Sequence, residues 1–377
     1  MRDFSRDFSL YIHIPFCRSK CAYCDFLSFA DDSCADAYFE ALCREIRAKG
    51  EKTRAVDHIY VGGGTPSIAY RYFPMIKQAL SESFILKEGA EISMECNPES
   101  VTADFVAAAR DFGVNRISIG VQTLSDPLLM RIGRAHDRAQ ALAALDLLTK
   151  SFPDVGADVM VGLPEQTAAD VCDTLARLLA FPLKHISCYS LILEEGTRLY
   201  DEAQKGLFAP DEDVDVDLYD RAVEKLYEAG FRRYEISNFC KYGALCGYNT
   251  SVWQYGDYLG LGLGAASFLK GKDGAFGVRE RNLTDLSEYI LHGGVGYSEM
   301  EEITLEEGMR EFVMLGLRLE EGLNLSRFRE LFGMDFYARF GAEIKEKEEY
   351  LLISEDRIAI RPDRFYVSNA IIGAIID

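Results

Sequence analysis

The stretch "YIHIPFCRSKCAYCDF", residues 11–26, holds three cysteines in C-x3-C-x2-C spacing directly after an apolar run, at Cys17, Cys21 and Cys24. Thiolates are soft ligands that suit iron–sulfur clusters or zinc. Structural zinc usually takes four ligands from two separated pairs, and the chain has no second C-x2-C pair. Three thiolates would leave one iron of a 4Fe-4S cluster open to a chelating small molecule. Zinc, and buried thiols at chance spacing, stay as alternatives.

The cysteine loop follows the first of six short apolar runs, each of which precedes a stretch with helical periodicity. These runs are residues 9–16, 57–64, 91–98, 116–123, 157–164 and 185–193. Such alternation predicts parallel strands with covering helices, and continuous apolar character indicates strands buried on both faces. Six units are two short of a closed eight-fold barrel, so we predict an α/β fold with a partial (β/α)6 barrel. The polar and glycine residues at the carboxyl ends of the strands predict an active site on that rim.

The alternation weakens after about residue 205, and we expect three parts. These are the partial barrel (1–205), a barrel-associated extension (206–299) and a small C-terminal domain (300–377). Within the extension the pattern predicts a helix with an acidic start at 210–231, a strand at 234–239 and a Gly-rich loop at 255–269.

The C-terminal domain is predicted to be a winged-helix-like α+β unit. Thr304 and Glu307 have capping-box spacing at the start of one helix, and Gly333 ends a second helix. The segment "EYLLISEDRIAIRPDRF" that follows is typical of a small hairpin.

The amino-acid composition is that of a globular protein and disfavours a nucleic-acid binder. The 377 residues are 48% hydrophobic and 27% charged, which is ordinary for a globular protein. The net charge of −20 disfavours nucleic-acid binding, because phosphates are bound by Lys and Arg. Neither a signal-peptide pattern nor an apolar run of membrane-spanning length occurs, so a cytoplasmic location without a transmembrane segment is predicted.

A second motif, "VGGGTPS" at residues 61–67, follows the second predicted strand. Consecutive glycines let the backbone approach a ligand without a Cβ in the way. A tight strand–helix turn with Pro66 as the first helical residue would explain the same letters.

Together, the cysteine loop after the first strand and the GGG-T-P turn after the second resemble the radical S-adenosylmethionine (SAM) superfamily. Within it, "YIHIPFC", "GGGTPS", "ISIGVQT" and "DVMVGLPEQT" are similar to the oxygen-independent coproporphyrinogen III oxidases and their relatives, the haem chaperones (HemW-like proteins). The resemblance covers nearly the whole chain and implies a 4Fe-4S cluster and SAM as cofactors.

The resemblance also implies roles for individual residues. Cys17, Cys21 and Cys24 would bind the cluster, and the amino and carboxylate groups of SAM would chelate its open iron. The residues implied to contact SAM are Tyr11, Tyr23, Gly63, Gly64, Thr65, Glu95, Gln122, Arg134, Asp158 and Ile192. Arg134 is expected to pair with the SAM carboxylate, Asp158 to bind a ribose hydroxyl and Ile192 to pack near the adenosyl group. Alternatively, Glu95 and Asp158 are strand-end carboxylates that cap helix starts.

Residue 26 helps to distinguish the two branches of the family, the oxidases and the haem chaperones. The oxidases typically carry a further cysteine two residues after the last cluster ligand, whereas this chain has Phe26, the chaperone-like form. They also place a longer segment before the cluster loop. Both features favour a radical SAM haem chaperone, which binds haem and passes it to an acceptor protein. The alternatives are coproporphyrinogen III oxidase, which decarboxylates propionates to vinyls, and another radical SAM tetrapyrrole enzyme.

One motif departs from the chaperone pattern C-x-H-N-x-x-Y-W with a following G-A-H-S. The chain has "CGYNTSVW" at residues 246–253 and "GAAS" further on, so Tyr248, Val252 and Ala266 replace the motif residues. Tyr248 and Cys246 are therefore the candidate haem ligands. The expected partners are haem or porphyrin, a haem-accepting protein and an electron donor, and peripheral contact with a membrane stays open.

Overall fold

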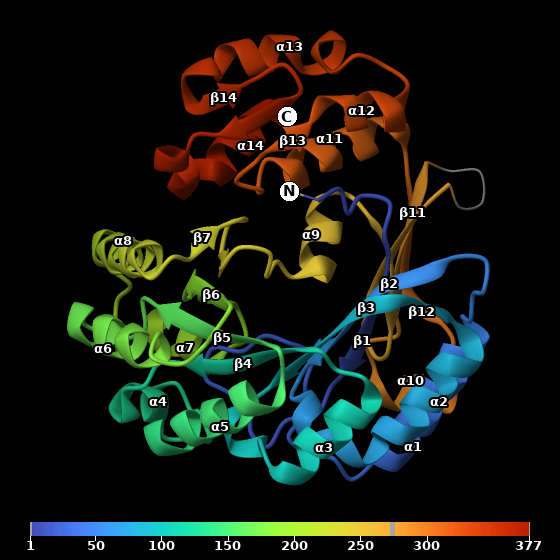
Figure 1. Ribbon diagram of the computed structural model, residues 1–377, viewed down its shortest axis with the longest axis vertical. Helices are drawn as coiled ribbons and strands as arrows, with labels where there is room; N and C mark the ends of the chain where they lie inside the picture. Colours follow the sequence, from blue (N-terminus) through green and yellow to red (C-terminus); the bar gives the residue numbers. More distant parts are fainter. Residues whose placement is uncertain (1, 272–275, 377) are drawn as a thin grey trace.

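The computed structural model describes residues 2–271 and 276–376. Six strands lie side by side in chain order and pair in parallel, with helices covering their outer side (Figure 1). They are β1 (Phe8–Ile14), β2 (Ala55–Gly63), β3 (Ile85–Cys96), β4 (Arg116–Gln122), β5 (Asp154–Val161) and β6 (His185–Ser190). The predicted six-unit α/β fold is confirmed.

Amphipathic helices connect these strands. They are α1 (Ala35–Ala48), η1 (Pro66–Tyr72), α2 (Phe73–Ser83), η2 (Pro98–Ser100), α3 (Ala103–Phe112), α4 (Asp126–Arg131), α5 (Arg138–Ser151) and α6 (Ala168–Leu178). Local sequence sets their ends. For example, the Thr102 side chain accepts a hydrogen bond from the Phe105 N–H at the start of α3, and Gly113 ends that helix with a φ of 108°.

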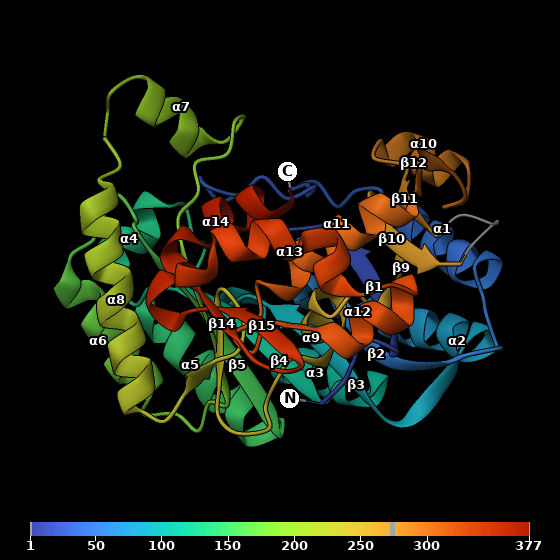
Figure 2. The same cartoon turned by 90° about the horizontal axis from the view of Figure 1, so that it is seen from above.

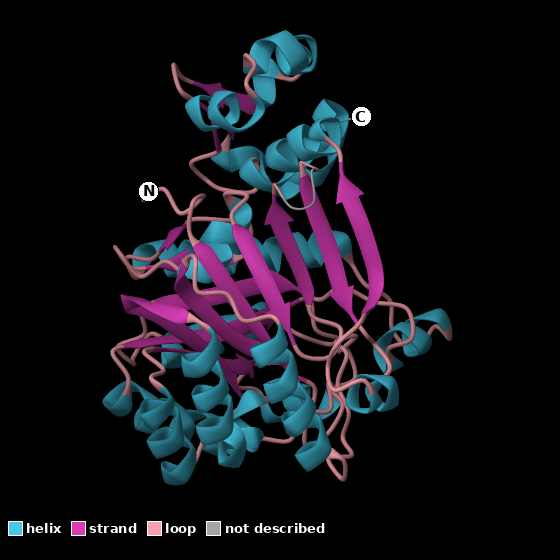
Figure 3. Cartoon of the chain, turned by 90° about the vertical axis from the view of Figure 1, so that its right-hand side faces the viewer, coloured by secondary structure: helices cyan, strands magenta, loops and turns pink. Residues whose placement is uncertain are grey.

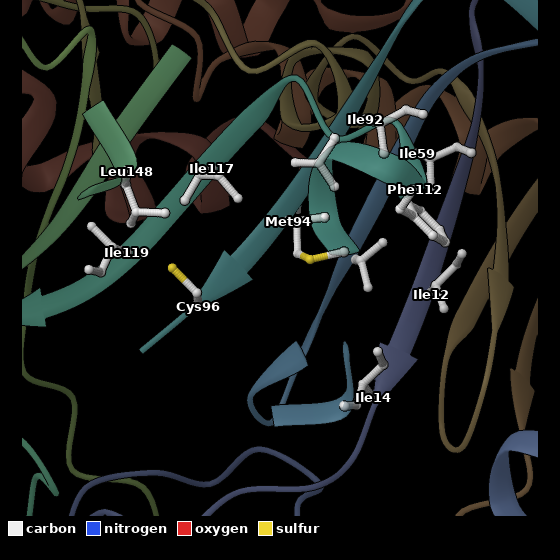
Figure 4. Packing of buried hydrophobic residues seen from close by; sticks show 14 of the residues in the cluster. Ile12, Ile14, Ile59, Ile92, Met94, Cys96, Phe112, Ile117, Ile119 and Leu148 are labelled. Carbon is white, nitrogen blue, oxygen red and sulfur yellow. The ribbon is translucent and has the colours of Figure 1, made fainter. Parts of the chain in front are cut away.

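The main hydrophobic core fills the space between the sheet and these helices. Figure 4 shows Ile12 of β1, Ile59 of β2 and Met94 of β3 in one layer with Phe112 of α3 and Leu148 of α5, and all five are buried. Burying a side chain of this size stabilises the fold by roughly 1.5–3 kcal/mol. The core therefore holds the strands rigidly, and with them the loops at their carboxyl ends.

The sheet continues beyond both edges of the six parallel strands. Beyond β1 lie β9 (Asp257–Leu261), β10 (Ala266–Lys270), β11 (Gly277–Asn282) and β12 (Tyr297–Ile303), and beyond β6 lie β8 (Asn238–Cys240) and β7 (Arg232–Arg233). β9 is parallel to β1, while β10 to β12 are antiparallel and stand as a ribbon in Figure 3. Of the strand predicted at 234–239, only the last two residues belong to β8. Glu235 instead forms an isolated bridge with Leu319 of the C-terminal unit.

The prediction of a Gly-rich loop at 255–269 is wrong, because this segment forms β9, β10 and the turn between them. The glycines permit close contact between backbones. A Cβ at Gly260 would lie 2.2 Å from the carbonyl oxygen of Ala266. Gly262 has a φ of 102°, and its N–H donates to the buried Glu45 carboxylate at 2.8 Å. The glycines in this segment are therefore explained by close packing of neighbouring strands.

Among the described residues, α7 (Arg198–Gln204) precedes the extension, and the helices within it are α8 (Glu212–Glu228), α9 (Gly247–Trp253) and α10 (Leu286–Leu291). The acidic start predicted for α8 is confirmed, with Asp211 as its N-cap. None of the helices in the described part of the chain combines the length and the apolar character that crossing a bilayer requires.

The C-terminal unit lies above the sheet in Figure 1 and has its own core, which includes Phe312, Phe328 and Phe340. Its elements are α11 (Leu305–Gly316), β13 (Leu323–Asn324), α12 (Leu325–Phe332), α13 (Phe336–Glu346), η3 (Glu348–Tyr350), β14 (Leu351–Ile353), β15 (Arg357–Ile360), η4 (Pro362–Val367) and α14 (Ser368–Ile376). The predicted capping box, the helix end at Gly333 and the hairpin are confirmed. β13 pairs with β15 and completes a winged-helix-like order.

Candidate functional site

The loop after β1 brings the three cysteines to the carboxyl rim of the sheet. Backbone hydrogen bonds hold the loop at several points: the Cys17 N–H donates to the Phe29 carbonyl at 2.9 Å, and the Ala22 N–H donates to the Ile132 carbonyl at 2.9 Å. The Leu199 N–H of α7 donates to the Ala22 carbonyl, also at 2.9 Å, and Figure 2 shows α7 standing out on the side of this loop. The loop is thus held by its own returning segment, by the end of α4 and by α7.

The thiols of Cys17, Cys21 and Cys24 line one cavity of about 540 Å³. The Thr65 hydroxyl lies 3.4 Å from the Cys17 sulfur, and an Arg134 N–H points at the Cys21 sulfur from 3.6 Å. Burial raises the pKa of the Cys17 and Cys24 thiols, while neighbouring cations favour thiolates. Within residues 2–271 and 276–376, no three His, Cys, Asp or Glu side chains surround the position of a single metal ion. Three thiols on one cavity wall are a donor set that fits an iron–sulfur cluster.

Most of the residues selected from the sequence line this same cavity. They are Cys17, Cys21, Tyr23, Cys24, Gly63, Gly64, Glu95, Gln122, Arg134, Asp158, Ile192 and Cys246. Tyr11, Thr65 and Tyr248 are not part of the lining and lie behind it. Residues from strands β2 to β5 and from the segments that follow several strands are therefore brought together at one end of the sheet.

Glu95, near the end of β3, is a half-buried acid of the cavity wall. Tyr60 donates to its Oε1 at 2.7 Å and the Gly63 N–H donates to its Oε2 at 3.2 Å. Burial raises the pKa of Glu95 to about 7, and the nearby Asp158 carboxylate raises it further, against these two hydrogen bonds. Asp158 itself accepts from the Ser118 hydroxyl at 3.0 Å, and burial raises its pKa as well. Two half-buried carboxyl groups thus lie in one wall of the cavity, where their ionised forms would favour a cation.

Gln122, the last residue of β4, and Arg134, which follows α4, both line the cavity. Gln122 has a φ of 65° beside a register shift between β4 and β5, and its Oε1 accepts from the Tyr189 hydroxyl at 3.0 Å. Arg134 donates to the side-chain oxygen of Asn97 at 2.8 Å and to the Gly120 carbonyl. Its Nε is buried without a hydrogen-bond partner among the described residues. The guanidinium is thus held in place, and its Nε–H remains available as a donor to a ligand.

The glycine turn after β2 packs against the cysteine loop. Gly63 has a φ of 111°, and a Cβ there would lie 2.5 Å from the His13 ring. A Cβ at Gly64 would lie 2.6 Å from the Phe16 carbonyl oxygen. The glycines are therefore required by internal packing, whatever ligand the turn also faces.

The two haem-ligand candidates lie in different surroundings. The Tyr248 ring packs at a tilt against the rings of Tyr60 and Tyr11, at centroid distances of 5.1 and 6.1 Å. Cys246 lines the cavity and its sulfur lies 3.7 Å from Oε1 of Glu91. Burial raises the pKa of Cys246 to about 12 and that of Tyr248 well above its ordinary value. Both groups are therefore protonated at neutral pH.

Sequence reasoning missed several polar residues of the lining. Tyr60, Asn97, Ser118 and Tyr189 orient Glu95, Arg134, Asp158 and Gln122 respectively. Each lies in or next to the carboxyl half of a strand, which is the one signal that could have selected them.

Two large apolar side chains stand at the cavity mouth. Phe26 is 60% exposed and Ile192 is 69% exposed, and both belong to the cavity lining. Lys20 donates to the Phe26 carbonyl and to the Ser28 hydroxyl, which fixes the backbone beside the ring. The mouth thus presents apolar surface next to the cysteines.

Comparison with known proteins agrees with this arrangement. Residues 11–178 match the radical SAM superfamily and residues 303–364 match the HemN C-terminal domain. The chain is 33% identical to the heme chaperone HemW of Bacillus subtilis, over 98% of this chain and 99% of that protein. It is 37% identical to the heme chaperone HemW of Synechocystis, over 83% of this chain and 78% of that protein.

A mitochondrial relative and one solved structure extend the comparison. The radical S-adenosyl methionine domain-containing protein 1 of Bos taurus is 33% identical over 94% of this chain and 83% of its own length. The structure of coproporphyrinogen III oxidase (HemN) from Escherichia coli superposes with a TM-score of 0.85 and 22% identity, over 99% of this chain and 91% of that one. At that identity the superposition shows a shared fold.

Proposed function

Because the chain belongs to the haem chaperone HemW family of radical SAM proteins, we propose that it binds haem and delivers it to an acceptor protein. Membership of the radical SAM superfamily implies a 4Fe-4S cluster and SAM. The observation that carries the proposal is the match to heme chaperones over almost the full length of both chains. The three-cysteine cavity is consistent with it.

Cys17, Cys21 and Cys24 would hold three irons of the cluster, and SAM would bind the fourth. When bound, the cluster supplies an electron to SAM. The remaining groups of the cavity bind and orient. Glu95 and Asp158 provide negative charge for the cationic SAM, and Arg134, with its spare Nε donor, provides positive charge for the SAM carboxylate.

The apolar mouth supports the chaperone over the oxidase. Phe26 stands beside Cys24 in the lining, where its exposed ring offers apolar contact instead of a further thiol. The haem ligand is a separate question. Cys246 and Tyr248 stay the candidates from the sequence, and each would have to release a proton to iron.

Anaerobic reconstitution of the cluster tests the proposal. The reconstituted protein is titrated with haem, and the complex is followed by absorbance and by gel filtration. We expect one haem per chain and transfer of that haem to an apo-protein acceptor. Failure to form a stoichiometric complex would contradict the proposal.

The same preparation separates the chaperone from the oxidase. It is incubated with coproporphyrinogen III, SAM and a reductant. We expect no protoporphyrinogen. Its formation together with 5′-deoxyadenosine would show that the chain is an oxidase instead.

A further inference from the structure

A buried pair of Glu99 and His136 lies next to the lining of the cysteine cavity. Glu99 belongs to η2, which follows β3, and His136 belongs to the segment between α4 and α5. The Nδ1 of His136 lies 3.4 Å from the Oε2 of Glu99, and the two side chains are 0% and 7% exposed, respectively. Neither residue lines the cysteine cavity. A role of this Glu99–His136 pair in the site must therefore act through a neighbouring residue.

Two links join the same two segments of the chain. In the first, Nη2 of Arg134 donates to the side-chain oxygen of Asn97 at 2.8 Å, and both residues line the cavity. Two residues further along each segment, Glu99 and His136 face each other in the second link. The buried pair thus holds the segments at a fixed spacing, and with them the guanidinium of Arg134.

Asn97 connects this arrangement to two of the cysteines. Its Nδ2 donates to the Thr65 hydroxyl at 2.9 Å, and that hydroxyl lies 3.4 Å from the Cys17 sulfur. On the other side, Nη1 of Arg134 lies 3.6 Å from the Cys21 sulfur. A shift of either segment would therefore move groups that contact the cysteines.

The charge of Glu99 also suits the arginine. Burial raises the pKa of Glu99, but the nearby His136 and Arg134 outweigh it and hold the pKa below its ordinary value. Glu99 is therefore an anion at neutral pH, and it attracts the guanidinium through a partly buried region where such attraction is stronger than in water. It does so without a hydrogen bond from the Nε of Arg134, which has no partner among the described residues. That donor stays free for a ligand.

Unpaired polar atoms are concentrated in these three residues. Both ring nitrogens of His136, the Nε of Arg134 and the Oε2 of Glu99 are buried without a hydrogen-bond partner in the part of the chain that the structure describes. Buried polar atoms are ordinarily hydrogen-bonded, because leaving them unpaired destabilises the fold. Apolar side chains would fill the same space without that cost. The presence of polar groups here indicates a role beyond packing.

We propose that Glu99 and His136 are positioning residues for Arg134, and that they hold its guanidinium where the free Nε–H can bind the carboxylate of SAM. The proposal rests on the proposed binding of SAM in the cysteine cavity and adds the residues that make this cavity selective for the carboxylate. Neither Glu99 nor His136 would contact SAM itself.

Selectivity for the carboxylate is the measurement that tests this role. The full-length, cluster-reconstituted protein is titrated with SAM and with decarboxylated SAM, which keeps the sulfonium, amino and adenosyl groups. The ratio of the two affinities reports contacts with the carboxylate and cancels effects on the rest of the cavity. Glu99→Gln and His136→Gln should each lower this ratio by about tenfold, the lower end of the cost of losing a partner that orients a ligand-binding group.

The exposed pair of Glu288 and His292 on α10 provides matched controls. Neither residue lines the cysteine cavity, so Glu288→Gln and His292→Gln should keep the wild-type ratio. A double-mutant cycle shows whether the buried pair acts through the arginine. In an Arg134→Gln background, Glu99→Gln should change the ratio by less than about twofold, because the residue that it positions is already gone.

Iron and sulfide content shows which variants fold and load the cluster. If His136→Gln loses the cluster, Glu99→Gln decides the test, because glutamine keeps the shape of the side chain and removes only its charge. Glu99→Asp keeps the charge and should recover part of the ratio that Glu99→Gln loses.

The outcomes separate this proposal from the proposed function. If the Glu99 and His136 variants hold the cluster and keep the wild-type ratio, the pair is structural only and the proposal is wrong. An equal fall of the ratio in the Arg134→Gln background would also overturn it, since the pair would then act by another route. Haem binding is measured separately. A wild type that binds SAM selectively but takes up no haem contradicts the chaperone function and leaves this proposal standing.

Discussion

Tyr60 and Glu95 join the second and third strands across the floor of the cysteine cavity through a hydrogen bond of 2.7 Å. The side chain is half-buried in the cavity wall, and the desolvation of its carboxyl group raises its pKa to about 7. Without a bound cation, the protonated form of Glu95 is therefore favoured below about pH 7. The charge of this cavity changes near neutral pH.

Glu95→Gln should change how stability depends on pH. The pKa of Glu95 is raised from 4.5 to about 7 on folding, so its contribution to stability is fully present below pH 4.5 and is lost as pH rises through 7. The glutamine of the variant does not titrate, so its stability does not fall in this way as pH rises. Above pH 7 its free energy of unfolding should exceed that of the wild type by up to about 3 kcal/mol, relative to the difference at low pH.

Urea unfolding of the cluster-free protein at pH 5 and pH 8 measures this effect. Glu88→Gln, at an exposed position on the same strand, is the control. A difference between wild type and Glu95→Gln that is the same at both pH values would rule out the assignment of a raised pKa to Glu95.

Binding of SAM should strengthen as pH rises through 7. Below that value Glu95 must release its proton to pair with the cationic ligand, which costs up to about tenfold in affinity per pH unit. The affinity should level off above pH 7. Equilibrium dialysis of the reconstituted protein at pH 6 and pH 8 is the measurement, and Glu95→Gln should bind SAM weakly with a flat profile. A steep profile in the variant would assign the pH dependence to another group.

Cys21→Ala should remove the cluster, because two thiolates cannot replace the three that line the cavity. Iron and acid-labile sulfide should fall to background after reconstitution. Cys172→Ala, a half-buried thiol on α6 outside this lining, should keep full content. Full iron content in the Cys21 variant would mean that the ligand set is wrong.

Gly63→Ala should destabilise the protein by roughly 2–5 kcal/mol, combining backbone strain with overpacking. The residue has a φ of 111°, and its Cβ would lie 2.5 Å from the His13 ring. Gly89→Ala is the matched control, because Gly89 has a φ of 74° and no atom within 4 Å of its Cβ position. The control should cost about 1–2 kcal/mol from backbone strain alone. Equal losses in thermal and urea unfolding would show that the contact with His13 does not matter.

The parallel strands and capped helices were predictable because local sequence determines them. Thr102 and Gly113 delimit α3, and continuous apolar runs mark strands that are buried on both faces. The Gly-rich strands were not predictable, because the reason for glycine at 260 is the carbonyl of Ala266 on a neighbouring strand. That contact exists only in the folded sheet.

The candidate site also has residues that the sequence could predict and residues that it could not. Motif spacing selected the cysteines, and most of the residues selected with them line the same cavity, since strand ends gather on one rim. The orienting partners Tyr60 and Asn97 lie more than thirty residues from the side chains that they orient, Glu95 and Arg134. A single sequence holds no local signal for such pairings.

The position of β1 inside the sheet sets an order of events during biosynthesis. Its neighbours are β2, some fifty residues later, and β9 at Asp257–Leu261. A ribosome must therefore release more than two thirds of the chain before the strand that carries the cysteine loop is paired on both sides. Until then β1 is an open edge that can pair with the wrong chain. Iron loading of a nascent or truncated chain that ends before residue 257 would begin on an unfinished sheet, so cluster insertion should follow the synthesis of β9.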